Sequence, residues 1–167
     1  LDQSNVWANF YGLFVDPVVL YGGTLSLSVN STHFDGLGLD LKPFYPGQPE
    51  WDFTAHSGIY GTNTGLLPVK GTAGNPSLFR RMDFGIYGLG VTLDVSNTRF
   101  EQIQARTKNG AAFGGDGIYL FKSSLYHSGF GKYGAYSFDK VSTAFRFRLA
   151  SVSIKDNHAH DVDFGIV

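Results

Sequence analysis

Apolar and polar residues alternate along this chain in runs of four or five residues, and each run ends at a turn residue. Three such runs contain Leu27–Val29, Leu93–Val95 and Val152–Ile154, in which apolar residues flank a Ser or an Asp. A period of two residues is expected of a half-buried β-strand. Small Asn, Asp, Ser and Thr residues follow the runs and favour tight turns. The pattern therefore predicts short strands joined by turns.

The strands recur at a fixed spacing. Phe79 lies 21 residues before Phe100, and Phe138 lies 21 residues before Ala159. An apolar residue stands three positions after each of these anchors, at Met82, Ile103, Val141 and Val162. A coil of about 21 residues is too small to bury its own apolar side, so coils must stack on one another to form a core. We therefore expect these four residues to form one interior column.

A third strand in each coil opens with the same three residues. Gly-Ile-Tyr occurs at 58–60, 85–87 and 117–119, and 145–146 and 165–167 stand in equivalent places. If the Ile side chains point inward, alternation places the next residues on the outer surface. These outward positions are Tyr60, Tyr87 and Tyr119, with Arg146 next in line.

Stacked coils of three short strands predict an all-β fold, a right-handed parallel β-helix that is a fragment of a longer solenoid. From about residue 18 onward, the Gly-Ile-Tyr strands and the Val-x-Asn-x-x-Phe type turn resemble the β-helix repeat proteins of the secreted and cell-surface type found in Bacteroidota. The resemblance implies a secreted or surface-exposed bacterial protein that acts as a scaffold, adhesin or carbohydrate-binding module. Polysaccharide lyases and galacturonan hydrolases share this fold, so a carbohydrate-active enzyme is the alternative.

The spacing also divides the chain. Residues 1–17 do not fit the register and are expected to cover the first coil or to belong to a preceding one. Residues 18–167 form the coils, with loop insertions near 42–51, 62–76, 106–116 and 123–134. The sequence stops inside a strand pattern, so we expect the last coil to continue in a longer parent chain or to be covered by another protein.

Composition narrows the possible partners. The net charge is −1, which gives no support for binding to nucleic acid. The chain has no cysteine, which excludes disulfides, thiolate chemistry and cysteine zinc sites. No run of 18 apolar residues exists, so no transmembrane helix is expected.

Two groups of residues are candidate binding sites for a glycan or a surface protein. Tyr60, Tyr87, Tyr119 and Arg146 would form an outward stripe, and a purely structural stacking ladder is the favoured interpretation of it. The second group is basic and belongs to the insertions after Ile103 and Ile118, which should lie on adjacent coils. Its members are Arg106, Lys108, Lys122, His127 and Lys132.

Acidic and histidine residues give weaker signals. Asp35, Glu101 and Asp139 each follow an anchor phenylalanine, and this recurrence favours a structural position over a calcium or catalytic site. Asp116 is a lone aspartate among glycines. His158 and His160 could share a metal on a strand, but they are expected in a turn that faces solvent. We therefore assign no catalytic residue, metal or cofactor, and expect a non-catalytic binding scaffold, with a subunit or cargo of a surface assembly as a second alternative.

Overall fold

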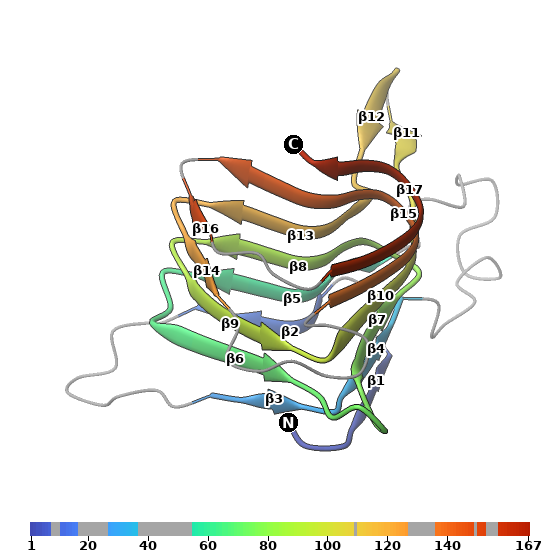
Figure 1. Cartoon of the computed structure of the whole chain (residues 1–167). Coiled ribbons are helices and arrows are strands. Elements are labelled where there is room, and N and C mark those ends of the chain that lie inside the picture. The colour runs from blue at the N-terminus through green and yellow to red at the C-terminus, as the bar shows by residue number, and fades with distance from the viewer. Residues whose placement is uncertain are drawn as a thin grey trace, which may run out of the picture.

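A computed structural model of the chain describes residues 1–7, 11–16, 27–36, 55–108, 110–126, 136–148, 150–152 and 157–167. Every regular element in these ranges is a β-strand (Figure 1). The strands pair in parallel, except for the antiparallel hairpin of β11 (Arg106–Lys108) and β12 (Ala111–Phe113). The described part of the chain is therefore all-β and built on parallel sheets.

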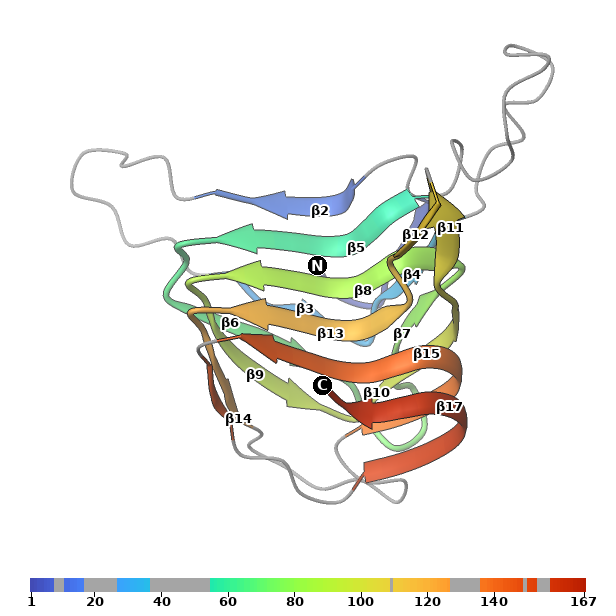
Figure 2. The ribbon, with the colours of Figure 1, turned by 90° about the horizontal axis from the view of Figure 1, so that it is seen from above.

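A ten-stranded sheet forms two of the three faces of the molecule. Face I holds β2 (Tyr11–Val15), β5 (Ala55–Thr62), β8 (Met82–Leu89) and β13 (Asp116–Phe121), which lie side by side in Figure 2. Face III holds β1 (Asn5–Trp7), β4 (His33–Asp35), β7 (Ser77–Arg80) and β10 (Thr98–Ile103). The long strands β15 (Tyr136–Arg148) and β17 (Asn157–Ile166) pair with each other along both faces.

Face II is a separate five-stranded sheet. It contains β3 (Val29–Asn30), β6 (Leu66–Lys70), β9 (Thr92–Ser96), β14 (Ser124–Tyr126) and β16 (Ser151–Val152). The chain visits the faces in a constant order, from II to III to I, as in β3–β4–β5 and β6–β7–β8. Residues far apart in sequence thereby become neighbours on one face.

The strand register follows the repeat in the sequence. Phe34, Phe79, Phe100, Phe138 and Ala159 are successive Cα partners on face III. This confirms the alignment predicted from the spacing of the anchor residues. Ile103, Val141 and Val162 are likewise successive partners.

Met82 is buried and is expected from the sequence to share one column with Ile103, Val141 and Val162. It begins β8 on face I and has Ala55 as its Cα partner. The chain turns just before it, because Arg81 adopts a left-handed backbone with φ of 58°. Ile103 and Val141 likewise follow the left-handed residues Gln102 and Lys140, so all three residues stand directly after the corner between faces III and I, although β8 begins at Met82 and β10 ends at Ile103.

Single residues with left-handed backbone make the corners between faces. They are Ser31 and Asn97 between faces II and III, Arg81, Gln102 and Lys140 between faces III and I, and Asn63, Gly90 and Lys122 between faces I and II. Asn and Gly adopt this conformation readily. For the long side chains it costs roughly 1–2 kcal/mol per residue, so packing on either side of the corner must offset that cost.

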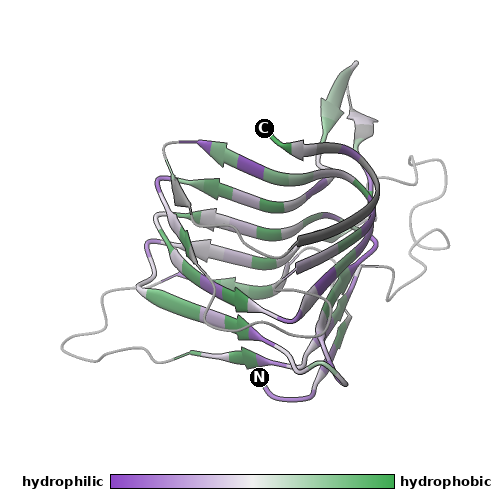
Figure 3. Cartoon of the chain, viewed as in Figure 1, coloured by the Kyte–Doolittle hydropathy of each residue, from purple (hydrophilic) through white to green (hydrophobic). Residues whose placement is uncertain are grey.

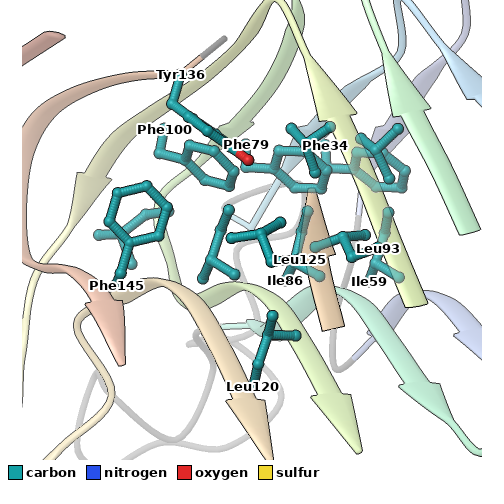
Figure 4. Close-up of a cluster of buried hydrophobic side chains, with 14 of the residues drawn as sticks. Phe34, Ile59, Phe79, Ile86, Leu93, Phe100, Leu120, Leu125, Tyr136 and Phe145 are labelled. Atoms are coloured by element: carbon teal, nitrogen blue, oxygen red, sulfur yellow. The ribbon is translucent and has the colours of Figure 1, made fainter. Parts of the chain in front are cut away.

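The core contains a row of phenylalanine rings (Figure 4). Phe34, Phe79, Phe100 and Phe138 are at most 1% exposed and stack with centroids 4.8, 5.2 and 5.1 Å apart. Each ring lies against a glycine of face I, in the pairs Phe34–Gly12, Phe79–Gly58, Phe100–Gly85 and Phe138–Gly117. A Cβ atom at any of these glycines would come within 2.4–2.7 Å of the ring. The glycine that opens each Gly-Ile-Tyr strand therefore makes room for a phenylalanine.

Aliphatic side chains fill the rest of the interior. Ile59, Ile86, Ile118 and Phe145 are in-register partners that point inward from face I, and Leu67, Leu93 and Leu125 do so from face II. Apolar and polar residues alternate along many strands in Figure 3, as expected when one side of a strand faces the core.

Strands lie in several segments of the expected division. Within 1–17, β1 pairs with β4 and β2 pairs with β5, so this segment contributes strands to faces III and I. β6 lies inside the expected loop 62–76, and β14 lies inside 123–134. The 106–116 insertion contains the β11–β12 hairpin, and 42–51 falls outside the described residues.

Candidate functional site

Aromatic side chains form a column along the outside of face I. Tyr60 stacks on Tyr87 with centroids 5.2 Å apart, and Tyr87 stacks on Tyr119 at 4.6 Å. Phe14 of β2 extends the column at 5.4 Å from Tyr60 and is 52% exposed. Arg146 is the register partner of Tyr119 at the other end. The inward neighbours Ile59, Ile86 and Ile118 are at most 1% exposed, which accounts for the outward position of the tyrosines.

A second group of rings lies beside this column. His56 lies 4.9 Å from Phe84 and 5.5 Å from both Tyr11 and Tyr87, measured between ring centroids. Phe113 reaches the group from the β11–β12 hairpin and contacts Phe84 at 5.7 Å in an edge-on arrangement. We call the combined set the aromatic surface, and its members are Tyr11, Phe14, His56, Tyr60, Phe84, Tyr87, Phe113 and Tyr119.

Only part of the aromatic surface was identified from the sequence. The sequence identifies three of its members as outward-facing, namely Tyr60, Tyr87 and Tyr119. It does not identify the other five, which are Tyr11, Phe14, His56, Phe84 and Phe113. Phe14 could have been found, because Gly12-Leu13-Phe14 repeats the Gly–apolar–aromatic order of Gly-Ile-Tyr. No local signal marked Phe113, because its position depends on how the hairpin packs against face I.

The stacking geometry limits what the column can bind. Neighbouring tyrosine rings are within 4–7° of parallel, so each ring covers the face of the next. The column therefore presents ring edges to the outside. A sugar ring stacks on an open aromatic face, and Phe14 at the end of the column is the ring that is more than half exposed.

Burial and mutual proximity also affect the tyrosine hydroxyls. Partial desolvation raises the pKa of Tyr87, and the neighbouring Tyr119 and Tyr60 raise it further. The pKa of Tyr11 is raised in the same way, by desolvation and then by Tyr60. The phenols of both residues therefore remain neutral hydrogen-bonding groups at physiological pH.

Asp116 and Arg146 form an ion pair beneath the end of the column. The Arg146 Nε donates to Asp116 Oδ1 at 2.9 Å, and its Nη2 donates to Thr143 Oγ1 at 3.3 Å. Asp116 is 2% exposed, and burial raises its pKa despite the opposing effect of Arg146. The guanidinium at the end of the tyrosine column is thus already engaged by a buried carboxylate.

The three basic residues of this group whose backbone the structure describes lie at two different places. Arg106 and Lys108 lie in β11, which precedes β13, whereas Lys122 is the corner residue that follows β13. The described basic residues therefore stand at opposite ends of that strand. Lys122 lies over the Phe121 ring, with its Nζ 5.4 Å from the centroid. His127 and Lys132 lie outside the described residues.

The acidic residues occupy one register column on face III, but a cation interrupts the series. In the strand register, Arg80 is the Cα partner of Asp35, Glu101 is the Cα partner of Arg80, and Asp139 is the Cα partner of Glu101. Asp35 is buried and accepts hydrogen bonds from Arg80 Nε at 2.8 Å and from Arg81 Nε at 2.8 Å. This bonding to Asp35 raises the pKa of Arg81 and gives Asp35 a structural role.

His158 and His160 lie in β17, so the turn predicted for them is wrong. Among the residues whose side chains the structure describes, no cluster of three or more His, Cys, Asp or Glu could hold a metal. The side chains of His158 and His160 fall outside that set.

A cavity of about 420 Å³ opens at the corner between faces II and III. Polar residues and backbone line much of it, including Thr72, Asn97, Arg99 and Ser137. Two of these side chains already form hydrogen bonds with the backbone of the corner. Asn97 Nδ2 donates to the Gly71 carbonyl at 3.2 Å, and Thr72 Oγ1 accepts from the Asn75 amide at 3.0 Å. The cavity is separate from the aromatic surface.

No protein-family model, curated protein or solved structure matches this chain. In the described ranges there is also no helix with the length and apolarity needed to span a membrane. The site must therefore be interpreted from its own geometry.

Proposed function

We propose that this chain is a stretch of a right-handed parallel β-helix. The constant order of the faces, the parallel pairing of successive strands and the repeated corner residues support this architecture. Parallel crossover connections are right-handed in nearly all proteins, which supports the proposed hand. The resemblance of the Gly-Ile-Tyr repeat to secreted and cell-surface β-helix proteins supports display outside a bacterial cell.

Its proposed role is that of a non-catalytic binding scaffold, with the aromatic surface as its contact region. The observation that carries this proposal is the gathering of aromatic side chains on the outside of face I, with Phe113 added by a hairpin that leaves the regular coil. If the rings served only to stabilise the strands by stacking, the Phe14–Tyr60–Tyr87–Tyr119 column would be enough. The rings beside the column are not explained by that role. Contiguous exposed aromatic patches are commonly interaction sites.

A protein surface suits the aromatic surface better than a sugar ring does. Most ring faces in the column are covered by their neighbours, which leaves the ring edges and the phenol hydroxyls for contact. Tyrosine-rich surfaces of this kind are enriched at protein–protein interfaces. Glycan stacking is confined to places such as the open face of Phe14.

An enzymatic role finds less support. Asp116 has a raised pKa, as a general acid would require. It is 2% exposed and already bonded to Arg146, so a substrate could not reach it without displacing that partner. Assays for reducing ends or unsaturated products on acidic polysaccharides test this alternative directly.

The experiment compares two equally exposed apolar residues on different faces. Phe14 on the aromatic surface and Leu66 on face II are both 52% exposed. Wild type, Phe14→Ser, Tyr87→Ser and Leu66→Ser are tested on a glycan array and on immobilised fibronectin, laminin, collagen and mucin.

We expect the wild type to bind a purified protein with a Kd of micromolar order, about −8 kcal/mol. Phe14→Ser and Tyr87→Ser should weaken that binding at least tenfold, whereas Leu66→Ser should not. Binding to glycans alone would overturn the choice of partner. No wild-type binding on either panel, or an equal loss in Leu66→Ser, would overturn the binding role of the aromatic surface.

A further inference from the structure

The cavity of about 420 Å³ lies where three successive coils turn from face II to face III. The loop before β7 forms one wall, the corner that leads into β10 forms the second, and the start of β15 forms the third. Ligand pockets are commonly of this order of volume. The residues that matter for binding are Thr72, Asn97, Thr98, Arg99, Tyr136 and Ser137.

Hydrogen bonds hold the wall that precedes β7 in place. The Thr72 N–H donates to the Asn75 carbonyl at 3.0 Å, and the Asn75 N–H donates to Thr72 Oγ1 at 3.0 Å. Ser31 Oγ, at the corner of the preceding coil, donates to the same Asn75 carbonyl at 2.7 Å. The Ser77 N–H donates to the Asn97 carbonyl at 3.1 Å. The cavity is therefore formed before any ligand enters, which lowers the entropic cost of binding.

The strand register sets the inner side of the cavity and its rim. Thr98 and Tyr136 are Cα partners, and each is 1% exposed, so they line the inner side. Arg99 and Ser137 follow them along the same strands and are also Cα partners, on the outer side of face III. Neighbouring strands are about 4.8 Å apart, so the guanidinium and the hydroxyl belong to adjacent positions of the rim.

The polar side chains of the cavity offer more hydrogen-bond donors than acceptors. Arg99 forms an ion pair with Glu101 through Nη2, and its Nε and Nη1 groups donate to no atom of the described residues. Ser137 Oγ has no hydrogen-bond partner in the same part of the chain, and Asn97 Nδ2 donates to the Gly71 carbonyl. A guanidinium can only donate, whereas a hydroxyl and a carboxamide also accept. A suitable ligand therefore carries an anionic acceptor and hydroxyl groups.

We propose that this cavity binds a small hydroxycarboxylic acid, with its carboxylate at Arg99 and its hydroxyl groups at Ser137 and Asn97. The N–H groups of a guanidinium form a fixed fork that matches the two oxygens of a carboxylate. The cavity lies at the corner between faces II and III, whereas the aromatic surface lies on the outside of face I. This proposal therefore does not depend on the function proposed for the aromatic surface.

The test compares two ligands that differ at one carbon. D-Gluconate and sorbitol are six-carbon polyols of the same length, and gluconate ends in a carboxylate where sorbitol ends in an alcohol. Calorimetry measures the binding of each to the full chain, and inorganic phosphate serves as an anion without hydroxyl-bearing carbons.

Arg99→Gln removes the guanidinium and Ser137→Ala removes the hydroxyl. Arg80→Gln is the matched control, because Arg80 is an arginine of the same face that does not line the cavity. The side chains of Arg80 and Arg99 are similarly exposed, at 43% and 50%, and each is paired with a carboxylate.

We expect the wild type to bind gluconate with a Kd of about 1 mM or tighter, and to bind sorbitol at least about tenfold more weakly. Arg99→Gln should weaken gluconate binding about tenfold or more, and Ser137→Ala should weaken it roughly threefold. Arg80→Gln should leave the affinity unchanged.

Circular dichroism shows whether each variant is folded, and the comparison of ligands in the wild type does not depend on any variant. No wild-type binding at about 10 mM gluconate would overturn the proposal. Equal affinity for gluconate and sorbitol, phosphate binding as tight as that of gluconate, or an equal loss in Arg80→Gln and Arg99→Gln would also overturn it.

Discussion

The fit between glycine and phenylalanine in the core can be tested by adding a single methyl group. In Gly58→Ala, the new Cβ would lie 2.4 Å from Phe79 Cδ1, 2.9 Å from Phe79 Cε1 and 3.0 Å from the Gly85 carbonyl oxygen. Two of these contacts are with a fully buried ring that is stacked on both sides, by Phe34 and Phe100. The ring therefore has little room to move.

Overpacking of this kind typically costs about 1–3 kcal/mol. For a chain of this size, about 1 kcal/mol corresponds to a change in melting temperature of roughly 2–4 °C. We expect Gly58→Ala to lower the melting temperature by about 2–12 °C, measured by circular dichroism and checked by urea unfolding.

Gly65→Ala is the matched control, because a Cβ at Gly65 has no atom within 4 Å. Its stability should stay within about 0.5 kcal/mol of wild type or rise slightly. Phe79→Leu should relieve part of the clash, so the double variant Gly58→Ala/Phe79→Leu should lose at least about 0.5 kcal/mol less than the sum of the single variants. Equal stability of Gly58→Ala and Gly65→Ala, or strict additivity, would refute the proposed packing.

Three further predictions concern a corner, the titration of a buried tyrosine and an ion pair. Gln102→Gly should stabilise the protein by up to about 1 kcal/mol, because φ is 55° there, whereas Gln102→Ala should not; urea unfolding of both variants checks this. Burial raises the pKa of Tyr136 above that of an unfolded tyrosine, so its contribution to stability is complete below pH 10 and is lost as the pH rises further. Unfolding free energy measured from pH 8 to 11 should therefore fall above pH 10, and less steeply in Tyr136→Phe; identical slopes would contradict this. Arg146→Ala leaves the Asp116 carboxyl buried without its guanidinium and should cost about 2–4 kcal/mol at pH 7, with less loss in Arg146→Ala/Asp116→Asn; equal losses in a urea comparison would show that the pair is unimportant.

The sequence predicted the register of face III well, because a constant spacing of 21 residues directly states which residues become neighbours. Phe79 and Phe100 are partners for that reason, as are Phe138 and Ala159. The same logic gave the inward and outward residues of the Gly-Ile-Tyr strands, whose alternation depends only on strand geometry.

The prediction from sequence failed where the local residue types favour a loop or turn but packing against the neighbouring strands favours a strand. β6 contains Pro68, which is unusual in a central strand, and it is flanked by Gly65 and Gly71. Leu67 and Val69 of this strand are nevertheless buried in the core, and this packing decides the conformation. His158 was assigned to a turn because Asp156 and Asn157 precede it, although its place in the repeat corresponds to Ser137 of β15.

The left-handed corners between faces III and I could not be predicted from the types of their residues. Arg81, Gln102 and Lys140 adopt left-handed backbone, although long side chains do not favour it. Their conformation is imposed by the strands on either side. The aromatic surface likewise depends on a hairpin whose packing cannot be inferred from spacing.

Strands separated by one repeat lie beside each other in a fixed register. Because the chain has no cysteine, an introduced pair reports on this directly. Arg99 and Ser137 are register partners on the outside of face III, and Asp139 lies two residues beyond Ser137 on the same side. Arg99→Cys/Ser137→Cys should form an intramolecular disulfide under mild oxidation much faster than Arg99→Cys/Asp139→Cys, as measured by mass spectrometry of the monomer. Equal rates, or faster closure of the second pair, would contradict the account.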